Sequence, residues 1–175
     1  MKIIYSITAF FVYYICKIFF FLFFKAVFLL RAQGISNIPA KGGFIIAANH
    51  ASFMDPPLIG VCIWKRKIKY MARSTLFKNP VAGTILRMWD TFPIKRGTID
   101  RNAWAQFAAY VKEGRGVVFF PEGTRTTDGE IKQGKPGTGM LIYNSKAPVV
   151  PVYIDNTFKA FPKNAKMPAF FTRVS

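Results

Sequence analysis

Short apolar runs alternate with helix-like segments between residues 43 and 154, and this alternation limits the possible folds more than any other feature of the chain. Apolar runs bounded by turn residues are typical of buried strands. We predict strands at 43–49, 67–73, 91–96, 116–120 and 147–154, with helices between them at 56–64, 76–89, 99–114 and 139–144. A helix between two strands returns the chain so that the next strand starts in the same direction. The sequence therefore predicts an α/β fold, with a mostly parallel sheet flanked by helices.

Residues 1–31 differ in composition from the rest of the chain. They contain no Gly or Pro, and they hold much of the hydrophobic content, which is 51% overall and includes 19 Phe. On a helical wheel, the basic residues of this segment fall within one arc of an otherwise apolar surface: Lys2, Lys17, Lys25 and Arg31. We therefore predict a membrane-associated helix at 1–31, followed by one α/β domain at 32–175.

The sequence leaves open how this helix lies in lipid. Its longest uncharged run, 3–16, is shorter than the roughly 20 apolar residues that a straightforward membrane span needs. One arrangement is a helix in the membrane interface with its lysines reaching toward water, and another is a tilted single span. A buried core helix is the third, although a domain of this size would then have to cover many Phe side chains.

Charge and cysteine content limit the partners and the location. The chain has 25 Lys and Arg against 8 Asp and Glu, a formal net charge of +17, which attracts anionic membranes, phosphorylated molecules and nucleic acid. Nucleic acid is disfavoured because the aromatic residues gather at the N-terminus and do not alternate with basic ones. The basic cluster at 65–69 suits an anionic lipid surface, an acidic carrier protein or plain solubility. Cys16 and Cys62 lack CxxC spacing, which favours a reducing, cytoplasm-facing location over a disulfide or zinc site.

His50 is the single histidine of the chain, and it follows the first predicted strand, five residues before Asp55. Positions five apart on one helix point about 140° away from each other, so the two side chains meet only if His50 lies in the loop and Asp55 in the first helical turn. Pro56 and Pro57 favour a helix start there. The carboxylate can then hold one imidazole nitrogen while the other accepts a proton. The alternatives are a structural histidine and an Asp55 that only caps the helix.

Two further polar segments, 95–97 and 122–125, also lie at the ends of predicted strands, and ligands bind at the carboxyl ends of parallel strands. Arg96 and Arg125 offer planar donors that suit a phosphate. Gly97, like Gly123, allows backbone amides to approach an anion closely. Neither segment matches a nucleotide-binding glycine loop, and solvated loop charges are the alternative.

Three other features complete the candidate site. We assign Glu122 to a substrate hydroxyl or to holding Arg125, and we expect the glycine-rich segment 134–139 to be a flexible loop nearby. Ser52 lacks the flanking glycines of a nucleophile elbow. His50 is therefore predicted to act directly on a substrate hydroxyl.

Four blocks of the sequence resemble the motifs of the glycerol-phosphate and lysophosphatidate acyltransferase family, in the family's order. They are NHASFMD (49–55), FPIKRG (92–97), FPEGTR (120–125) and VVPVY (149–153). The resemblance implies an α/β domain at a membrane surface that moves a fatty acyl group from a thioester of coenzyme A or acyl carrier protein. It implies no metal and no cofactor beyond that co-substrate.

The resemblance also implies roles for single residues. His50 would be the catalytic base and Asp55 its orienting partner. The phosphate of the acceptor would be bound by Arg96, Glu122, Gly123, Thr124 and Arg125, and the pocket would be shaped by Pro121 and Pro151. Members of the family usually continue beyond the point where this chain stops, in what resembles the opening of a strand at 170–175, so we expect domain 32–175 to lack its C-terminal end.

We therefore expect acylation of the free hydroxyl of 1-acyl-glycerol-3-phosphate, giving phosphatidate, at a membrane with the catalytic domain on the cytoplasmic side. The expected partners are a lysophospholipid, an acyl thioester with acyl carrier protein as one possible carrier, and the anionic membrane surface. Two alternatives stay open: another acceptor such as a lyso-ornithine lipid, and an inactive, truncated remnant that only binds lipid. Nucleic-acid binding rests on net charge alone and ranks last.

Overall fold

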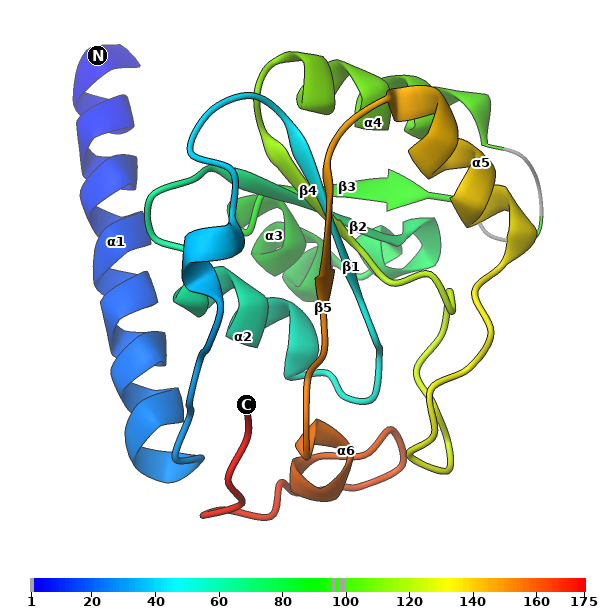
Figure 1. Cartoon of the computed structure of the whole chain (residues 1–175). Helices are drawn as coiled ribbons and strands as arrows, with labels where there is room; N and C mark the ends of the chain where they lie inside the picture. Colours follow the sequence, from blue (N-terminus) through cyan, green and yellow to red (C-terminus); the bar gives the residue numbers. More distant parts are fainter. Residues whose placement is uncertain (1, 96, 98–99) are drawn as a thin grey trace.

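The computed structural model describes residues 2–95, 97 and 100–175, and it contains a five-stranded sheet in which every strand pair is parallel. The strand order is β3-β2-β4-β1-β5 (Figure 1). The strands are β1 (Phe44–Ala48), β2 (Ile68–Arg73), β3 (Thr91–Ile94), β4 (Gly116–Phe119) and β5 (Val149–Val152). All five lie within the predicted runs, so the predicted parallel α/β fold is confirmed.

Helices cover both faces of this sheet (Figure 1). They are α1 (Lys2–Val27), α2 (Asp55–Cys62), α3 (Pro80–Met88), α4 (Arg101–Lys112), α5 (Pro136–Ser145) and α6 (Thr157–Ala160), with short 3-10 turns η1 (Ile35–Asn37) and η2 (Ser74–Lys78). Side chains alternate across β1, so Phe44 and Ile46 join the core beneath α1 and α2, whereas Ile45 joins the core beneath α4 and α5. Burial on both faces explains why these strands are almost wholly apolar.

Two predicted helical regions differ from the structure. The helix predicted at 76–89 is divided, because Asn79 precedes a proline and is extended (ψ 124°), which ends η2 and begins α3. The segment 134–139 was predicted to be a flexible loop, yet residues 136–139 form the first turn of α5. Pro136 stands at the first helical position, where its missing N–H costs nothing.

The α1 helix packs against α2, and Phe24 and Phe28 on its inner face are buried in the core. In one of the arrangements left open by the sequence the lysines of this helix reach toward water, but Lys17 points into the protein: its Nζ donates a hydrogen bond to the Ile63 carbonyl at 2.5 Å. This carbonyl follows α2, where helical carbonyls lack partners within the helix. Among the described residues, no helix combines the length and apolar character needed to cross a membrane.

Residues 170–175 were predicted to open a strand, but they form none. Instead, Phe171 N–H donates to Val27 O at 2.8 Å and Val174 N–H to Phe28 O at 3.0 Å, so the segment supplies partners to carbonyls at the end of α1. Val174 is fully buried, and Arg31 N–H donates to its carbonyl at 3.1 Å. Figure 1 shows this red segment beside the lower end of α1.

Candidate active site

The loops that follow β1 and β4 are neighbours because these two strands pair directly, with Ile46 opposite Val118. Adjacent strands lie about 4.8 Å apart, so side chains just beyond their carboxyl ends are brought within contact distance. His50 lies two residues after β1 and Glu122 three residues after β4. The predicted clustering of polar segments at this edge is thus present for these two loops.

His50 and Asp55 are in contact, with 2.8 Å between His50 Nδ1 and Asp55 Oδ2. His50 lies in the loop and Asp55 opens α2, which is the arrangement that their spacing requires. The same Oδ2 accepts backbone N–H groups from Ala51 and Ser52, both at 2.7 Å. The carboxylate is fully buried, whereas 14% of the His50 side chain is exposed. Asp55 therefore holds the imidazole and fixes the backbone of the loop at the same time.

The imidazole is held from a second side by Phe120. The two rings stack with their centroids 4.0 Å apart and their planes 18° apart. The His50 carbonyl accepts the N–H of Thr126 at 2.8 Å, which ties it to the long loop after β4. Within the described residues, Nε2 of His50 has no hydrogen-bond partner, so this nitrogen is available to a substrate proton.

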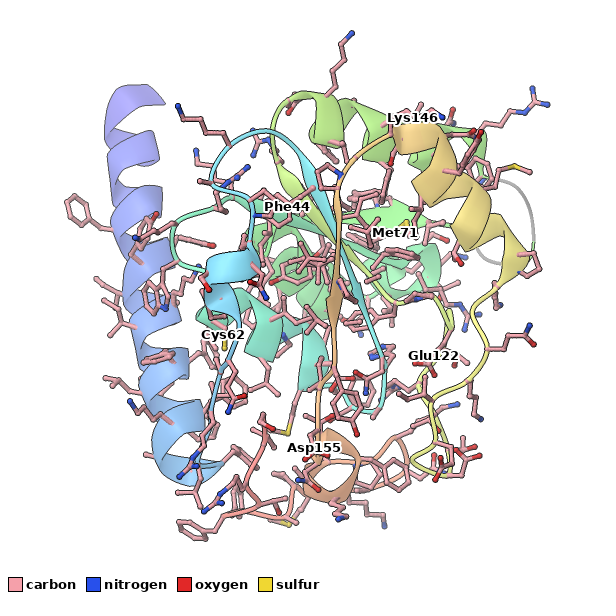
Figure 2. The ribbon with its side chains drawn as sticks, in the orientation of Figure 1. Phe44, Cys62, Met71, Glu122, Lys146 and Asp155 are labelled. Carbon is pink, nitrogen blue, oxygen red and sulfur yellow. The ribbon has the colours of Figure 1, made fainter. Side chains whose placement is uncertain are left out.

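Glu122 links three segments of the site. One carboxylate oxygen accepts the N–H of His50 at 2.8 Å, and the other accepts the N–H of Lys132 at 3.2 Å. The side chain is 5% exposed, and Figure 2 labels it on the loop after β4. We expected Glu122 to bind a substrate hydroxyl or to hold Arg125; in the structure its carboxylate is engaged by two backbone N–H groups. Its binding of the acceptor stays a prediction.

Arg125 lies over an aromatic ring. Its guanidinium carbon is 3.3 Å from the ring centroid of Phe53, so the half-buried cation contacts the loop that contains His50. Gly123 has φ 69°, and an added Cβ would stand 2.9 Å from Cε of Lys135. A side chain at this position would therefore strain the backbone and displace the lysine. Thr124 between them is exposed.

The remaining predicted site residues are Arg96, Pro121 and Pro151. Arg96 lies outside the described residues; Lys95 N–H beside it donates to Asp100 Oδ2 at 2.8 Å, and this bond is the largest cause that lowers the pKa of Asp100. Pro121 is half-buried, and its carbonyl accepts the N–H of Lys135 at 2.9 Å. Pro151 lies opposite Ala47 on the edge strand β5 and is exposed. Its predicted role in a pocket stays a prediction.

Ser52, the hydroxyl side chain nearest to His50 in the sequence, is engaged elsewhere, and the two cysteines lie on or beside α1. The Ser52 hydroxyl is buried and donates to the Phe161 carbonyl at 2.7 Å. Cys16 lies on α1, and Cys62 ends α2, beside α1 in Figure 2. Burial raises the pKa of the Cys62 thiol to about 11, which leaves it protonated at neutral pH. Direct action of His50 on a substrate hydroxyl stays a prediction.

Sequence reasoning missed two residues that position His50. One is Phe120, whose place directly after an apolar strand gave no sign of a ring contact. The other is Asn49, whose side chain donates to Ile154 O at 2.9 Å and accepts Ile154 N–H at 2.7 Å. Asn49 thus joins the loop after β1 to the end of β5. The sequence did contain a signal for Asn49: a polar amide at the end of an apolar strand needs hydrogen-bond partners once it is buried.

An apolar cavity of about 620 Å³ lies between α1, α2, β2 and the end of α3. Pro57, Gly60 and Val61 of α2 form one wall, and Phe20 and Met88 lie on others. Pro57 comes two residues after Asp55, so the cavity begins on the helix that holds the imidazole and extends away along it.

The fold and this site define a parallel α/β protein with a histidine–aspartate pair at the carboxyl edge of its sheet, in which the imidazole is partly exposed and the carboxylate is buried. The sequence profile described as Acyltransferase matches residues 30–155. The chain therefore belongs to the acyltransferase family, and the resemblance drawn from its four motifs is confirmed.

Individual relatives agree with this assignment. The chain is 36% identical over 123 residues to the 1-acyl-sn-glycerol-3-phosphate acyltransferase of Bacillus subtilis, covering 70% of this chain and 60% of that protein. It is 32% identical over 133 residues to the enzyme of the same name from Borreliella burgdorferi, covering 75% and 53%. The crystal structure of the 1-acyl-sn-glycerophosphate (LPA) acyltransferase PlsC from Thermotoga maritima matches with a TM-score of 0.65 and 28% identity, covering 83% of this chain and 59% of that one. The chain thus spans about three fifths or less of each.

Proposed function

We propose that this chain transfers a fatty acyl group from a thioester to the free hydroxyl of 1-acyl-glycerol-3-phosphate, giving phosphatidate. The observation that carries the proposal is the His50–Asp55 contact of 2.8 Å, with Nε2 of the imidazole left available. The names of the similar bacterial proteins support the choice of acceptor.

The proposed reaction is a direct displacement. Nε2 of His50 removes the proton of the acceptor hydroxyl while its oxygen attacks the thioester carbonyl. The new C–O bond forms, the C–S bond breaks, and the imidazolium returns its proton to the departing thiolate. The buried carboxylate of Asp55 keeps Nδ1 as the N–H donor and stabilises the transient positive charge. The thioester is already activated, so the proposal needs no cofactor beyond coenzyme A or acyl carrier protein as the acyl carrier.

The phosphate of the acceptor is assigned to the basic loops beside His50. Arg125 supports this assignment because Thr126, the next residue, donates its N–H to the His50 carbonyl at 2.8 Å. Gly123 leaves the backbone at this turn without a covering side chain of its own. We further propose Arg96 as a second cation, on the loop after β3.

The apolar cavity along α2 suits an acyl chain. It is of the size that protein pockets for lipid-sized ligands commonly have, and its walls are mostly hydrocarbon. An acyl chain placed here would lie on the helix whose first residue is Asp55. We also propose that the protein works at a membrane surface facing the cytoplasm, since α1 presents exposed apolar side chains such as Phe19 and Leu22.

A panel of acceptors tests the proposal. Purified protein in neutral detergent micelles receives a labelled acyl thioester, of coenzyme A or of acyl carrier protein, with lysophosphatidate, lysophosphatidylcholine or a lyso-ornithine lipid. We expect labelled phosphatidate and much less of the other products. Transfer to the lyso-ornithine lipid alone would show that this lipid, and not lysophosphatidate, is the acceptor. Failure with every acceptor and both carriers would indicate an inactive protein.

A further inference from the structure

A second cavity, of about 610 Å³, lies at the end of α1 and is independent of the site at His50. Its polar lining consists of Lys25, Arg31, Arg173 and Gln33, with no carboxylate among the lining residues. In the described part of the chain, none of the three cations has a carboxylate within salt-bridge distance. Three uncompensated cations around one hollow indicate an anionic ligand.

The backbone builds this cavity from two distant segments. After α1, the Leu30 N–H returns to Phe24 O at 3.2 Å, and Leu29 takes the left-handed conformation (φ 49°) that glycine usually supplies at a helix end. The strained turn is held by the hydrogen bond from Arg31 N–H to the carbonyl of buried Val174. This bond places Arg173 beside the residues that follow α1. The basic lining is therefore a built feature and does not depend on one mobile side chain.

Exposed apolar side chains lie on the two segments that form the basic cavity, and one of them, Leu29, is part of its lining. Leu22 and Leu29 of the α1 region are 58% and 43% exposed, and Phe170 and Phe171 of the opposite segment are 49% and 75% exposed. Large apolar side chains gathered at a surface in this way mark a contact with a partner. Their position beside three cations suits a ligand with an anionic head and hydrocarbon tails, whereas a free anion would leave them in water.

The cavity lies at the same edge of the sheet as His50. Asn49 is bonded to Ile154, the next residue Asp155 donates its N–H to Ser175 O at 2.6 Å, and Val174 is bonded to Phe28 at the end of α1. Asp155 is labelled in Figure 2 on this lower side of the molecule. A membrane that contacts the cavity would therefore be near the mouth of the candidate active site.

We propose that Lys25, Arg31 and Arg173 bind the phosphate of an anionic membrane phospholipid, whose tails lie against Leu22, Leu29, Phe170 and Phe171. The site is distinct from the one proposed for the reacting acceptor. Its bound lipid would connect α1 to segment 169–175 and would fix the orientation of the protein on the membrane. This assignment stands on the cavity and its lining, and it does not depend on the proposed reaction.

Vesicle flotation tests the proposal. The full chain is mixed with vesicles of phosphatidylcholine alone or of phosphatidylcholine with an equal part of phosphatidylglycerol. A double variant, Lys25→Gln with Arg173→Gln, is compared with Lys112→Gln and Arg101→Gln, which remove the same charge from exposed positions on α4, outside the lining of this cavity. Each cation near an anionic surface contributes about 1 kcal/mol, so we expect the preference for anionic vesicles to fall about 30-fold in the first variant and far less in the second. Binding to neutral vesicles should be similar in all three proteins.

Equal losses in the two double variants would overturn the proposal, because the general field of a +17 protein would then explain the binding. Melting of wild type in neutral detergent gives a second readout. Phosphatidylglycerol should raise Tm more than phosphatidylcholine does, and the first variant should lose this difference. An equal rise in Tm with inorganic phosphate alone would show that the ligand of the cavity is a free anion and not a lipid. If the first variant melts well below the control, Arg31→Gln is used in its place.

Discussion

At the scale of single residues, Asp55 combines a proposed catalytic role with a structural one. Its Oδ2 accepts the His50 ring N–H and two backbone N–H groups, while Oδ1 is buried without a partner among the described residues. An amide at this position keeps an acceptor oxygen for the backbone, but it no longer supplies the negative charge that stabilises an imidazolium. The two functions of the carboxylate can therefore be separated by substitution.

Asp55→Asn should lower kcat by about 10²- to 10⁴-fold, the range typical of general base catalysis, with KM for lysophosphatidate nearly unchanged. Its new amide N–H would be buried where Oδ1 lies, which should cost about 1–3 kcal/mol of stability. Steady-state kinetics and a thermal melt measure the two effects. A kcat within threefold of wild type, by the same steady-state comparison, would show that Asp55 only caps the loop.

Phe120 should support catalysis because its flat ring stacks on the imidazole of His50 and holds it in place. Phe120→Leu keeps an apolar side chain but removes the surface on which the imidazole stacks, so we expect kcat to fall about tenfold through looser positioning of His50. Phe119→Leu is the matched control, because Phe119 packs on Phe107 beneath α4. If both variants lose the same activity, the effect comes from general destabilisation of β4.

At the scale of elements, the pairing of His50 with Asp55 followed from local signals, because a strand end and a Pro56–Pro57 helix start lie close together in the sequence. The strand positions were likewise predictable from apolar runs. The apolar pattern of 76–89 suggested one helix. The structure divides it into η2 and α3, because Asn79 precedes a proline and the helical conformation is disfavoured in that position. The inward direction of Lys17 depended on the Ile63 carbonyl, which is 46 residues away.

Lys17 gives a pH-dependent prediction for α1. Burial lowers the pKa of its ammonium from 10.5 to about 8. Between these values the unfolded chain binds more protons than the folded one, so stability rises with pH in this window, and the full penalty is present below pH 8. Lys17→Met removes the titration. We expect wild type to gain about 3 kcal/mol relative to this variant from pH 8 to pH 10.5, measured by denaturant unfolding.

A difference between wild type and Lys17→Met that stays constant over this pH range would contradict the burial of the charged group. Lys25→Met is the control, because Lys25 is exposed on the same helix.

At the scale of the whole molecule, segment 169–175 joins the end of α1 to the loop after β5. These contacts could not be predicted from the sequence, since they pair residues about 145 positions apart and follow no repeat of apolar residues. The strand order could not be predicted either, because it also depends on pairing between residues that are far apart in the sequence. The four motifs were enough to indicate the family without knowledge of the strand order or of the contacts of segment 169–175.

Val174→Asp tests this connection. The side chain is fully buried in the core that contains Phe28, so an unpaired charge there should destabilise the protein by about 3 kcal/mol or more and lower Tm. Phe171→Asp is the control, since Phe171 is 75% exposed and has φ 59°, a conformation that Asp tolerates better than Phe. Equal melting of the two variants would mean that the segment does not stabilise α1.

The central claim is that Nε2 of His50 removes the proton of the acceptor hydroxyl. Its most direct test is acyl transfer to lysophosphatidate by wild type and His50→Ala in the same micelles, with a thermal melt to show that the variant is folded. We predict a fall in kcat of about 10³-fold or more with Tm nearly unchanged. A folded variant that keeps wild-type activity would contradict it, and the base would have to be sought elsewhere in the site.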